Sequence, residues 1–274
     1  MLNWGIPFYL LGLYGIARFF IRPKDDSKPG TISWSPLDTV SVAIAIYFIS
    51  QIIGALLAYI YPLAQGWSSE RISTWFEQNV YGQFSLMLGV EVLAVVLIGI
   101  FLRRRQASFK TIGLKRSSWL RDIAYILMGF GIYFVLYLVV LGIVQMIAPI
   151  DVDQRQQLGF GDVYGLQLIP VFISLVILPP VAEELLIRGF LYSGLKKNLP
   201  KIWAVLIASA LFAVAHLQAG SGEKLLWVAA VDTFVLSLVL IFLREKTGSL
   251  HAPIGLHMLK NFIAFLSLFV FHLI

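Results

Sequence analysis

The stretch IAYILMGFGIYFVLYLVVLGIVQMIA, residues 123–148, contains no Asp, Glu, Lys or Arg. It exceeds the roughly 20 apolar residues that an α-helix needs to cross a membrane. Similar apolar runs predict seven further spans, at residues 2–21, 37–61, 84–102, 168–194, 202–217, 225–243 and 253–274. The sequence therefore predicts an all-α polytopic membrane protein of about eight transmembrane helices.

Two of these runs differ from an uninterrupted spanning helix. The run at 202–217 is short for a span. The run at 168–194 contains Pro170, Pro179 and Pro180. Because proline removes a backbone donor and clashes with the preceding turn, we expect this helix to kink or break.

The composition supports the same class of protein. Hydrophobic residues make up 59% of the chain and charged residues only 13%. In a typical soluble domain about 45–50% of the residues are apolar and about 25% are charged. This excludes a soluble globular enzyme and a disordered chain. The sequence has no Cys, which excludes disulfides, zinc–thiolate sites, iron–sulfur clusters and a cysteine nucleophile.

The net charge of +6 indicates topology rather than nucleic-acid binding. Most of the 21 Lys and Arg residues lie on alternate loops, at 18–28, 103–121, 196–201 and 244–246. Since excess Lys and Arg mark the cytoplasmic side, both termini are predicted to face away from the cytoplasm. The sequence shows no repeat of fixed period. Residues 1–274 are predicted to form a single membrane domain in the lipid bilayer.

Ionisable side chains inside spans are costly, so they usually pair with one another or line a cavity. Most of those found here lie in the C-terminal half, which predicts a buried polar site there. The set, with one amide, is Glu91, Glu183, Glu184, Arg188, His216, Asp232, His257, Lys260 and Asn261. We interpret Glu91 and Asp232 as structural carboxylates, with Lys260 or Arg188 as possible partners.

The sequence EELLIR at 183–188 places two glutamates on different faces of a helix. Glu184 and Arg188 are four residues apart and share a face, which predicts a buried ion pair. Glu183 is turned by about 100° from Glu184 and is left free for chemistry. The alternative is that all three residues form an ion network that packs helices.

Two further motifs contain histidine. His216 ends the apolar sequence FAVAH, and alone it would be interpreted as a buried histidine bonded to a neighbouring carbonyl. His257 and Asn261 are also four residues apart, so their N–H groups can lie side by side and hold a developing oxyanion. An interhelical hydrogen bond is the alternative for this pair. Together with Glu183, these residues fit a hydrolytic set of base, oxyanion donors and proton source.

The three motifs, Glu-Glu-x-x-x-Arg at 183–188, Phe-x-x-x-His at 212–216 and His-x-x-x-Asn at 257–261, resemble the signature of the CAAX prenyl protease and bacteriocin-processing family, also called CPBP or Abi. Arg188-Gly189 and the sequence KTGSL at 246–250 fit as well, and the resemblance covers about residues 168–265, the predicted catalytic core.

This resemblance implies an intramembrane glutamic endopeptidase with an eight-helix core, a multi-pass integral membrane protein that would lie in the cell membrane if the host is prokaryotic. Glu183 and His216 would activate water, His257 and Asn261 would stabilise the oxyanion, and Glu184 and Arg188 would support the site. No metal ion or cofactor is implied. The substrate would be a peptide or protein near the membrane surface, with prenylated proteins as one option.

Two other readings stay open at this point. One is a zinc-dependent membrane protease with Glu183, His216 and His257 as ligands, since His₂Glu is a known catalytic zinc set. The other is a non-catalytic immunity or scaffold protein, or a transporter, because buried charges also mark transport pathways.

The depths of the motif residues do not agree on simple helix counting. From the predicted cytoplasmic ends, Glu183 and His216 lie about 18–21 Å deep, but His257 only about 6–8 Å. A kinked helix or a shifted boundary near Pro253 would bring them together.

Overall fold

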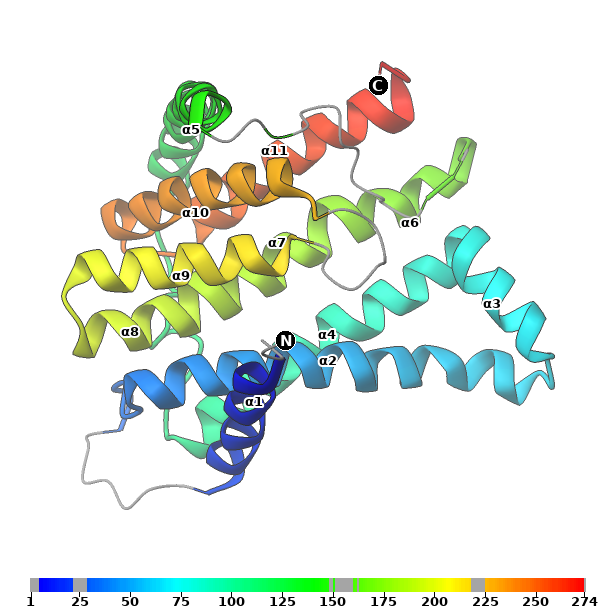
Figure 1. Cartoon of the computed structure of the whole chain (residues 1–274), viewed down its shortest axis with the longest axis horizontal. Coiled ribbons are helices and arrows are strands. Elements are labelled where there is room, and N and C mark those ends of the chain that lie inside the picture. Colours follow the sequence, from blue (N-terminus) through cyan, green and yellow to red (C-terminus); the bar gives the residue numbers. More distant parts are fainter. Residues whose placement is uncertain are drawn as a thin grey trace.

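The computed structural model describes residues 5–21, 29–147, 150, 160–161, 163–217 and 225–273, and all regular secondary structure in these ranges is helical (Figure 1). The N-terminal half contains α1 (Gly5–Phe20), α2 (Pro36–Ala64), α3 (Ser69–Gln78), α4 (Val80–Arg104) and α5 (Trp119–Ile147). The C-terminal half contains α6 (Leu168–Phe172), α7 (Leu178–Glu183), α8 (Tyr192–Asn198), α9 (Lys201–Ala215), α10 (Trp227–Thr247) and α11 (His251–Phe265).

The predicted class, an all-α polytopic membrane protein, is confirmed. Six helical runs in the described residues are long and apolar enough to cross a membrane. Two further runs correspond to the shorter helices α1 and α9, of 16 and 15 residues. The short run at 202–217 is therefore a short helix, as expected. The ends of the predicted spans at residues 2–4, 148 and 274 lie outside the described residues.

The proline-rich run changes its helix type instead of breaking. Residues from Gly165 to Asn198 form one continuous helical run. Between α6 and α7 lies the π-helical segment η2 (Ile173–Ile177), and between α7 and α8 lies a second one, η3 (Glu184–Leu191). Pro179 and Pro180 fall in the first turn of α7, where a missing backbone N–H costs little. The longer π-helical turn that precedes them removes the need for a break.

This long helix lies at the centre of the bundle. On one side, η3 and α7 contact α2 and α4, which pack against each other and against α1. On the other side they contact α9 and α11, while α10 packs between α5, α9 and α11. The motif-bearing helix is therefore surrounded by neighbours from both halves of the chain.

Two glycines let α2 and α4 approach closely beside the polar site. A Cβ on Gly54 would lie 2.6 Å from Val90 Cα, and one on Gly89 would lie 2.8 Å from the Gly54 carbonyl oxygen. Such small residues allow backbones to pack directly against each other in a membrane. The close contact places the turn of α4 that carries Glu91 against α2.

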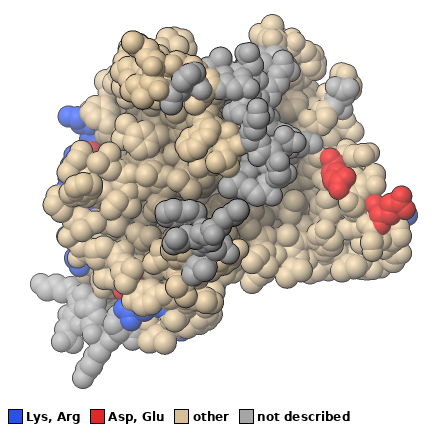
Figure 2. Space-filling model, in the orientation of Figure 1, with Lys and Arg blue, Asp and Glu red and all other residues tan. Residues whose placement is uncertain are grey.

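Charged side chains separate toward the two ends of the molecule. The face drawn in Figure 2 carries Lys and Arg at the end where α8, α9 and α10 have their basic termini, and Asp or Glu at the opposite end, near α3. The positive-inside rule assigns the basic end to the cytoplasm. This orientation stays a prediction, and its loop residues 22–28, 151–159, 162 and 218–224 and the C-terminal Ile274 lie outside the described residues.

Candidate active site

Glu184 and Arg188 form a buried ion pair, as their spacing suggested. Arg188 Nη1 donates to Glu184 Oε1 at 2.8 Å, and both side chains are 0% exposed. The two residues lie in η3, where the wider π-helical turn still keeps them on one face. Arg188 Nε and Nη2 have no hydrogen-bond partner among the described residues, but the guanidinium lies 4.3 Å from the centre of the Phe212 ring. A cation–π contact therefore replaces part of the missing hydration.

His257 lies between the two glutamates. Its Nδ1 is 3.0 Å from Glu184 Oε1, a hydrogen bond, and its Nε2 is 3.8 Å from Glu183 Oε2, which is too long for one. Since an ionised carboxylate only accepts, Nδ1 carries the hydrogen in that state. Glu184 then receives hydrogen bonds from Arg188 and His257 and fixes the orientation of the imidazole ring.

The expected difference in depth is absent because the chain around the first turn of α11 is covered, although the side chain of His251 itself is 46% exposed. The helix starts at His251, and Leu250 and Ala252 are both fully buried. The loop between α4 and α5 covers this turn: the Leu250 N–H donates to the Gly113 carbonyl at 3.0 Å, and Ser249 Oγ donates to the Lys115 carbonyl at 3.1 Å. His257 therefore reaches the level of Glu183 after fewer residues than helix counting from the surface would require.

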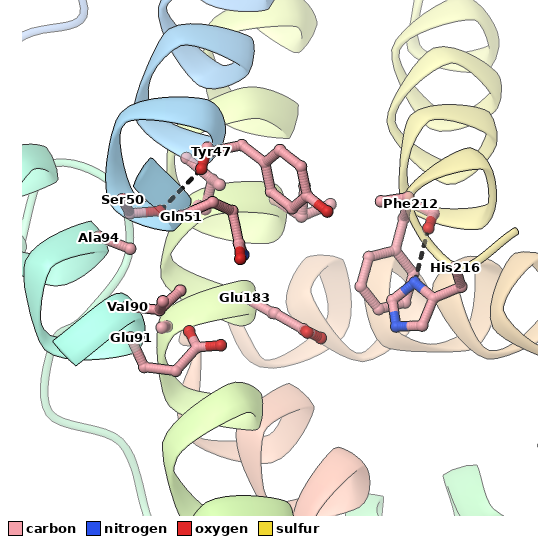
Figure 3. Close-up of a pocket in the computed structure, with 13 residues that line it drawn as sticks. Tyr47, Ser50, Gln51, Val90, Glu91, Ala94, Glu183, Phe212 and His216 are labelled. Carbon is pink, nitrogen blue, oxygen red and sulfur yellow. Dashed lines mark hydrogen bonds between the residues drawn. The ribbon is translucent and has the colours of Figure 1, made fainter. Parts of the chain in front are cut away.

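His216 caps the end of α9 and faces Glu183 across a cavity (Figure 3). Its Nδ1 is 2.8 Å from the Phe212 carbonyl oxygen. Because a carbonyl only accepts, Nδ1 must carry the hydrogen. In the neutral ring Nε2 is then a free acceptor, as a proton-accepting group needs. His216 can therefore be bonded to a nearby carbonyl through Nδ1 and still accept a proton at Nε2.

Phe212 connects three of the motif residues. Besides its contact with Arg188, its ring packs edge-on against His216 at 4.6 Å and against His257 at 6.1 Å between ring centres. It belongs to one of the motifs, yet sequence reasoning assigned it no task. The structure gives it one: its ring contacts the buried guanidinium and both imidazoles.

Asn261 makes the interhelical hydrogen bond that the sequence left open as an alternative. Its Nδ2 donates to the Leu175 carbonyl in η2 at 2.9 Å. That carbonyl would normally accept from the N–H of residue 179 or 180, but both are prolines. Asn261 therefore satisfies an acceptor that the proline pair leaves open. One amide hydrogen of Asn261 stays available for another acceptor.

Asp232 and Lys260 also form an ion pair, so the structural interpretation of Asp232 is confirmed. Lys260 Nζ lies 2.6 Å from Asp232 Oδ2, and the Tyr133 hydroxyl donates to the other carboxylate oxygen. This network joins α11 to α10 and α5. It holds the helix that carries His257 and Asn261.

Glu91 is the one carboxylate of the polar set that forms no ion pair or hydrogen bond with a described residue. It lines the cavity with Glu183 and His216, together with Tyr47, Gln51 and Val90 (Figure 3). The cavity has a volume of about 150 Å³, which is enough to hold water. The interpretation of Glu91 as a member of a structural ion pair was wrong, because Arg188 and Lys260 have other partners.

The described residues include no group of three His, Asp or Glu side chains arranged to hold a metal ion. In particular, Glu183 and His216 line the cavity, whereas His257 does not, and the three form no common ligand set. The zinc alternative therefore finds no preformed site in this part of the chain.

Comparison with known proteins adds the family. Residues 165–263 match the family model described as type II CAAX prenyl endopeptidase Rce1-like. This part of the chain is similar to the CAAX protease family. The CAAX protease match spans a little over a third of the chain and includes every motif residue from Glu183 to Asn261. Searches of the curated proteins and of the solved structures found no significant match.

The six apolar helices and the match to a CAAX protease model support a multi-pass integral membrane protein. Three contributors to its site were not found by sequence reasoning: Phe212 as a packing centre, the Leu175 carbonyl, and Glu91 as a cavity residue. The first two depend on which helices lie opposite each other. For Glu91 a signal existed, since it is the only ionisable residue of α4 before Arg103.

Proposed function

We propose that the protein is an intramembrane endopeptidase that hydrolyses a peptide bond with water activated by Glu183 and His216. The observation that carries this proposal is the shared cavity: both side chains face it from different helices, and it has room for water. The family supports a CAAX-type protease. The catalytic roles below are our assignment.

In the proposed reaction, Glu183 and His216 Nε2 accept hydrogen bonds from one water molecule. As the water oxygen attacks the peptide carbonyl carbon, its proton moves to this pair, and the carbonyl electrons move onto oxygen. A tetrahedral oxyanion forms. When the C–N bond breaks, the carbonyl re-forms and the stored proton passes to the leaving amine.

The oxyanion would be held by His257 and Asn261. In a protonated His257 both ring nitrogens carry hydrogen, so Nδ1–H can donate to Glu184 while Nε2–H donates to the oxyanion. Asn261 would contribute its second amide hydrogen, since the first is used by the Leu175 carbonyl. Glu184 and Arg188 would act as positioning residues through the ring of His257.

The substrate would be a peptide or protein that reaches the cavity from the membrane surface, with lipid-modified proteins as one class. A zinc protease is less favoured because the three candidate ligands form no metal-holding group. A non-catalytic scaffold has no specific observation in its favour: it needs neither the cavity nor the aligned acceptors of Glu183 and His216.

The experiment is a comparison of processed peptides in cells that carry the wild-type protein or Glu183→Gln. The substitution keeps the size of the side chain and removes the proton acceptor. We expect a set of cleaved peptides to vanish in Glu183→Gln cells and to remain in cells with Glu77→Gln, an exposed residue on α3. Identical peptide sets, with equal amounts of folded protein, would refute the proposal.

A further inference from the structure

Glu91 has no role in the reaction proposed above, yet it faces the same cavity. Figure 3 shows its carboxylate turned from α4 toward the side of the cavity where Glu183 lies. None of the described residues gives Glu91 a hydrogen bond or an ion pair. A lone ionisable residue inside a membrane span is costly to keep, so it usually marks a function.

The cations of the site are already bound elsewhere. Arg188 is held by Glu184, and Lys260 is held by Asp232. Among the described residues, the cavity is lined by carboxylates, an imidazole and uncharged groups, and by no Lys or Arg. A positively charged group that entered it would therefore meet an unpaired carboxylate and no Lys or Arg from the described part of the chain.

The walls around Glu91 are apolar. Val90 and Ala94 from α4 and Leu186 and Ile187 from η3 line the same space. An apolar passage that ends at a carboxylate fits a methylene stem with a cationic head, as in Lys or Arg. The cavity volume of about 150 Å³ suits one such side chain but not a folded domain.

We propose that Glu91 forms a specificity subsite that binds a lysine or arginine side chain of the substrate beside the peptide bond to be cleaved. This rests on the proposed function, because the cavity is the one that holds Glu183 and His216. Glu91 binds the cationic head by a charge-assisted hydrogen bond, while the apolar walls contact the stem. The subsite thereby selects basic peptides.

Binding of two matched probes tests the subsite without requiring catalysis. Hexylguanidinium and hexylurea have the same length and nearly the same shape, but only the first is charged. We expect the purified protein to bind hexylguanidinium at least about tenfold more tightly than hexylurea, as one charge-assisted hydrogen bond allows. This preference should fall to about twofold or less in Glu91→Gln and stay unchanged in Glu77→Gln, which removes the same charge from α3.

Glu91→Asp covers the case in which Glu91→Gln does not fold. It keeps the charge on a shorter stem, so it should retain a reduced preference for hexylguanidinium. Equal preferences in the wild-type protein, Glu91→Gln and Glu91→Asp would overturn the subsite, as would the absence of any preference in the wild-type protein.

Cleavage separates the subsite from the protease proposal. Two peptides that differ only by lysine or norleucine beside the scissile bond make this test. The wild-type protein should cleave the lysine peptide with the lower KM, and Glu91→Gln should cleave both with similar KM values. Cleavage of both peptides with equal KM by the wild-type protein would refute the subsite and leave the protease intact. Selective probe binding without cleavage of either peptide would refute the protease and leave the subsite intact.

Discussion

Glu184 accepts hydrogen bonds from two directions, and this explains why two adjacent glutamates have different tasks. Arg188 and His257 both donate to Oε1 of Glu184. Glu183 has no such bond: its Oε2 is 3.8 Å from His257 Nε2, and 27% of its side chain is exposed. Glu184 Oε2 has no hydrogen-bond partner among the described residues, but it is buried and Glu184 does not line the cavity, so this carboxylate is poorly placed to take a proton from water. The free one is better placed.

The first prediction at the residue scale concerns the buried pair. Glu184→Gln should lower the yield of folded protein, because it leaves the guanidinium of Arg188 buried without its counter-charge, at a cost of about 3–5 kcal/mol. The double variant Glu184→Gln/Arg188→Met removes both charges, so it should recover the yield. It should not recover the activity, because His257 still lacks its carboxylate acceptor.

Size-exclusion yield and peptide cleavage measure the two effects separately. Glu184→Gln with the yield and activity of the wild-type protein would contradict this assignment. A double variant with full activity would show that Glu184 does not position His257.

Sequence reasoning placed these residues correctly but not completely. Spacing on one helix was enough to pair Glu184 with Arg188, since both lie on the same turn. The contact between Glu184 and His257 joins residues 73 positions apart. It depends on the depth at which α11 starts, which the covering loop at Gly113 and Lys115 sets. No local pattern encodes that depth.

At the scale of the elements, the proline pair and Asn261 act together to connect two helices. Pro179 and Pro180 leave the Leu175 carbonyl without a donor from its own helix, and Asn261 on α11 supplies one. This bond ties α11 to η2 beside the segment that carries Glu183. The sequence predicted a distortion of the long helix from its prolines. It did not reveal that the distortion creates an acceptor for another helix, because the facing helix is known only from the fold.

Asn261→Ala should therefore have two separable effects. Loss of the interhelical bond should destabilise the protein by about 0.6–1.7 kcal/mol. Loss of an oxyanion donor should lower kcat by about 10²–10³-fold while KM changes little. Thermal unfolding in detergent and steady-state kinetics measure the two.

Pro179→Ala provides the matched background. It restores a backbone N–H that can reach the Leu175 carbonyl. Asn261→Ala should therefore destabilise the Pro179→Ala protein less than it destabilises the wild-type protein. The fall in kcat should persist. If the fall in kcat disappears together with the stability cost, Asn261 acts only by holding α11 in place.

On the scale of the whole molecule, the polar site lies where the two halves of the chain meet. α2 and α4 supply Tyr47, Gln51 and Glu91 to the cavity, while α7 and α9 bring Glu183 and His216. Hydropathy predicted the all-helical class and the order of the apolar runs, because apolar length alone sets a span; six of the eight predicted runs are long enough to cross a membrane, and α3 was not predicted. It could not predict the contribution of α4, since the motifs all lie after residue 165 and the pairing of α4 with α7 is a matter of tertiary packing.

The central claim is that Glu183 activates water for peptide hydrolysis without a metal ion. Its most direct test is the turnover of a peptide by purified wild-type protein and Glu183→Gln, each after prolonged chelation, with Glu77→Gln as the charge-matched control. The account predicts unchanged turnover for the chelated wild-type protein and for Glu77→Gln, and a loss of about 10²–10⁴-fold for Glu183→Gln, the usual contribution of a proton acceptor. Turnover by Glu183→Gln at the wild-type rate would contradict it, as would activity that chelation abolishes and zinc restores.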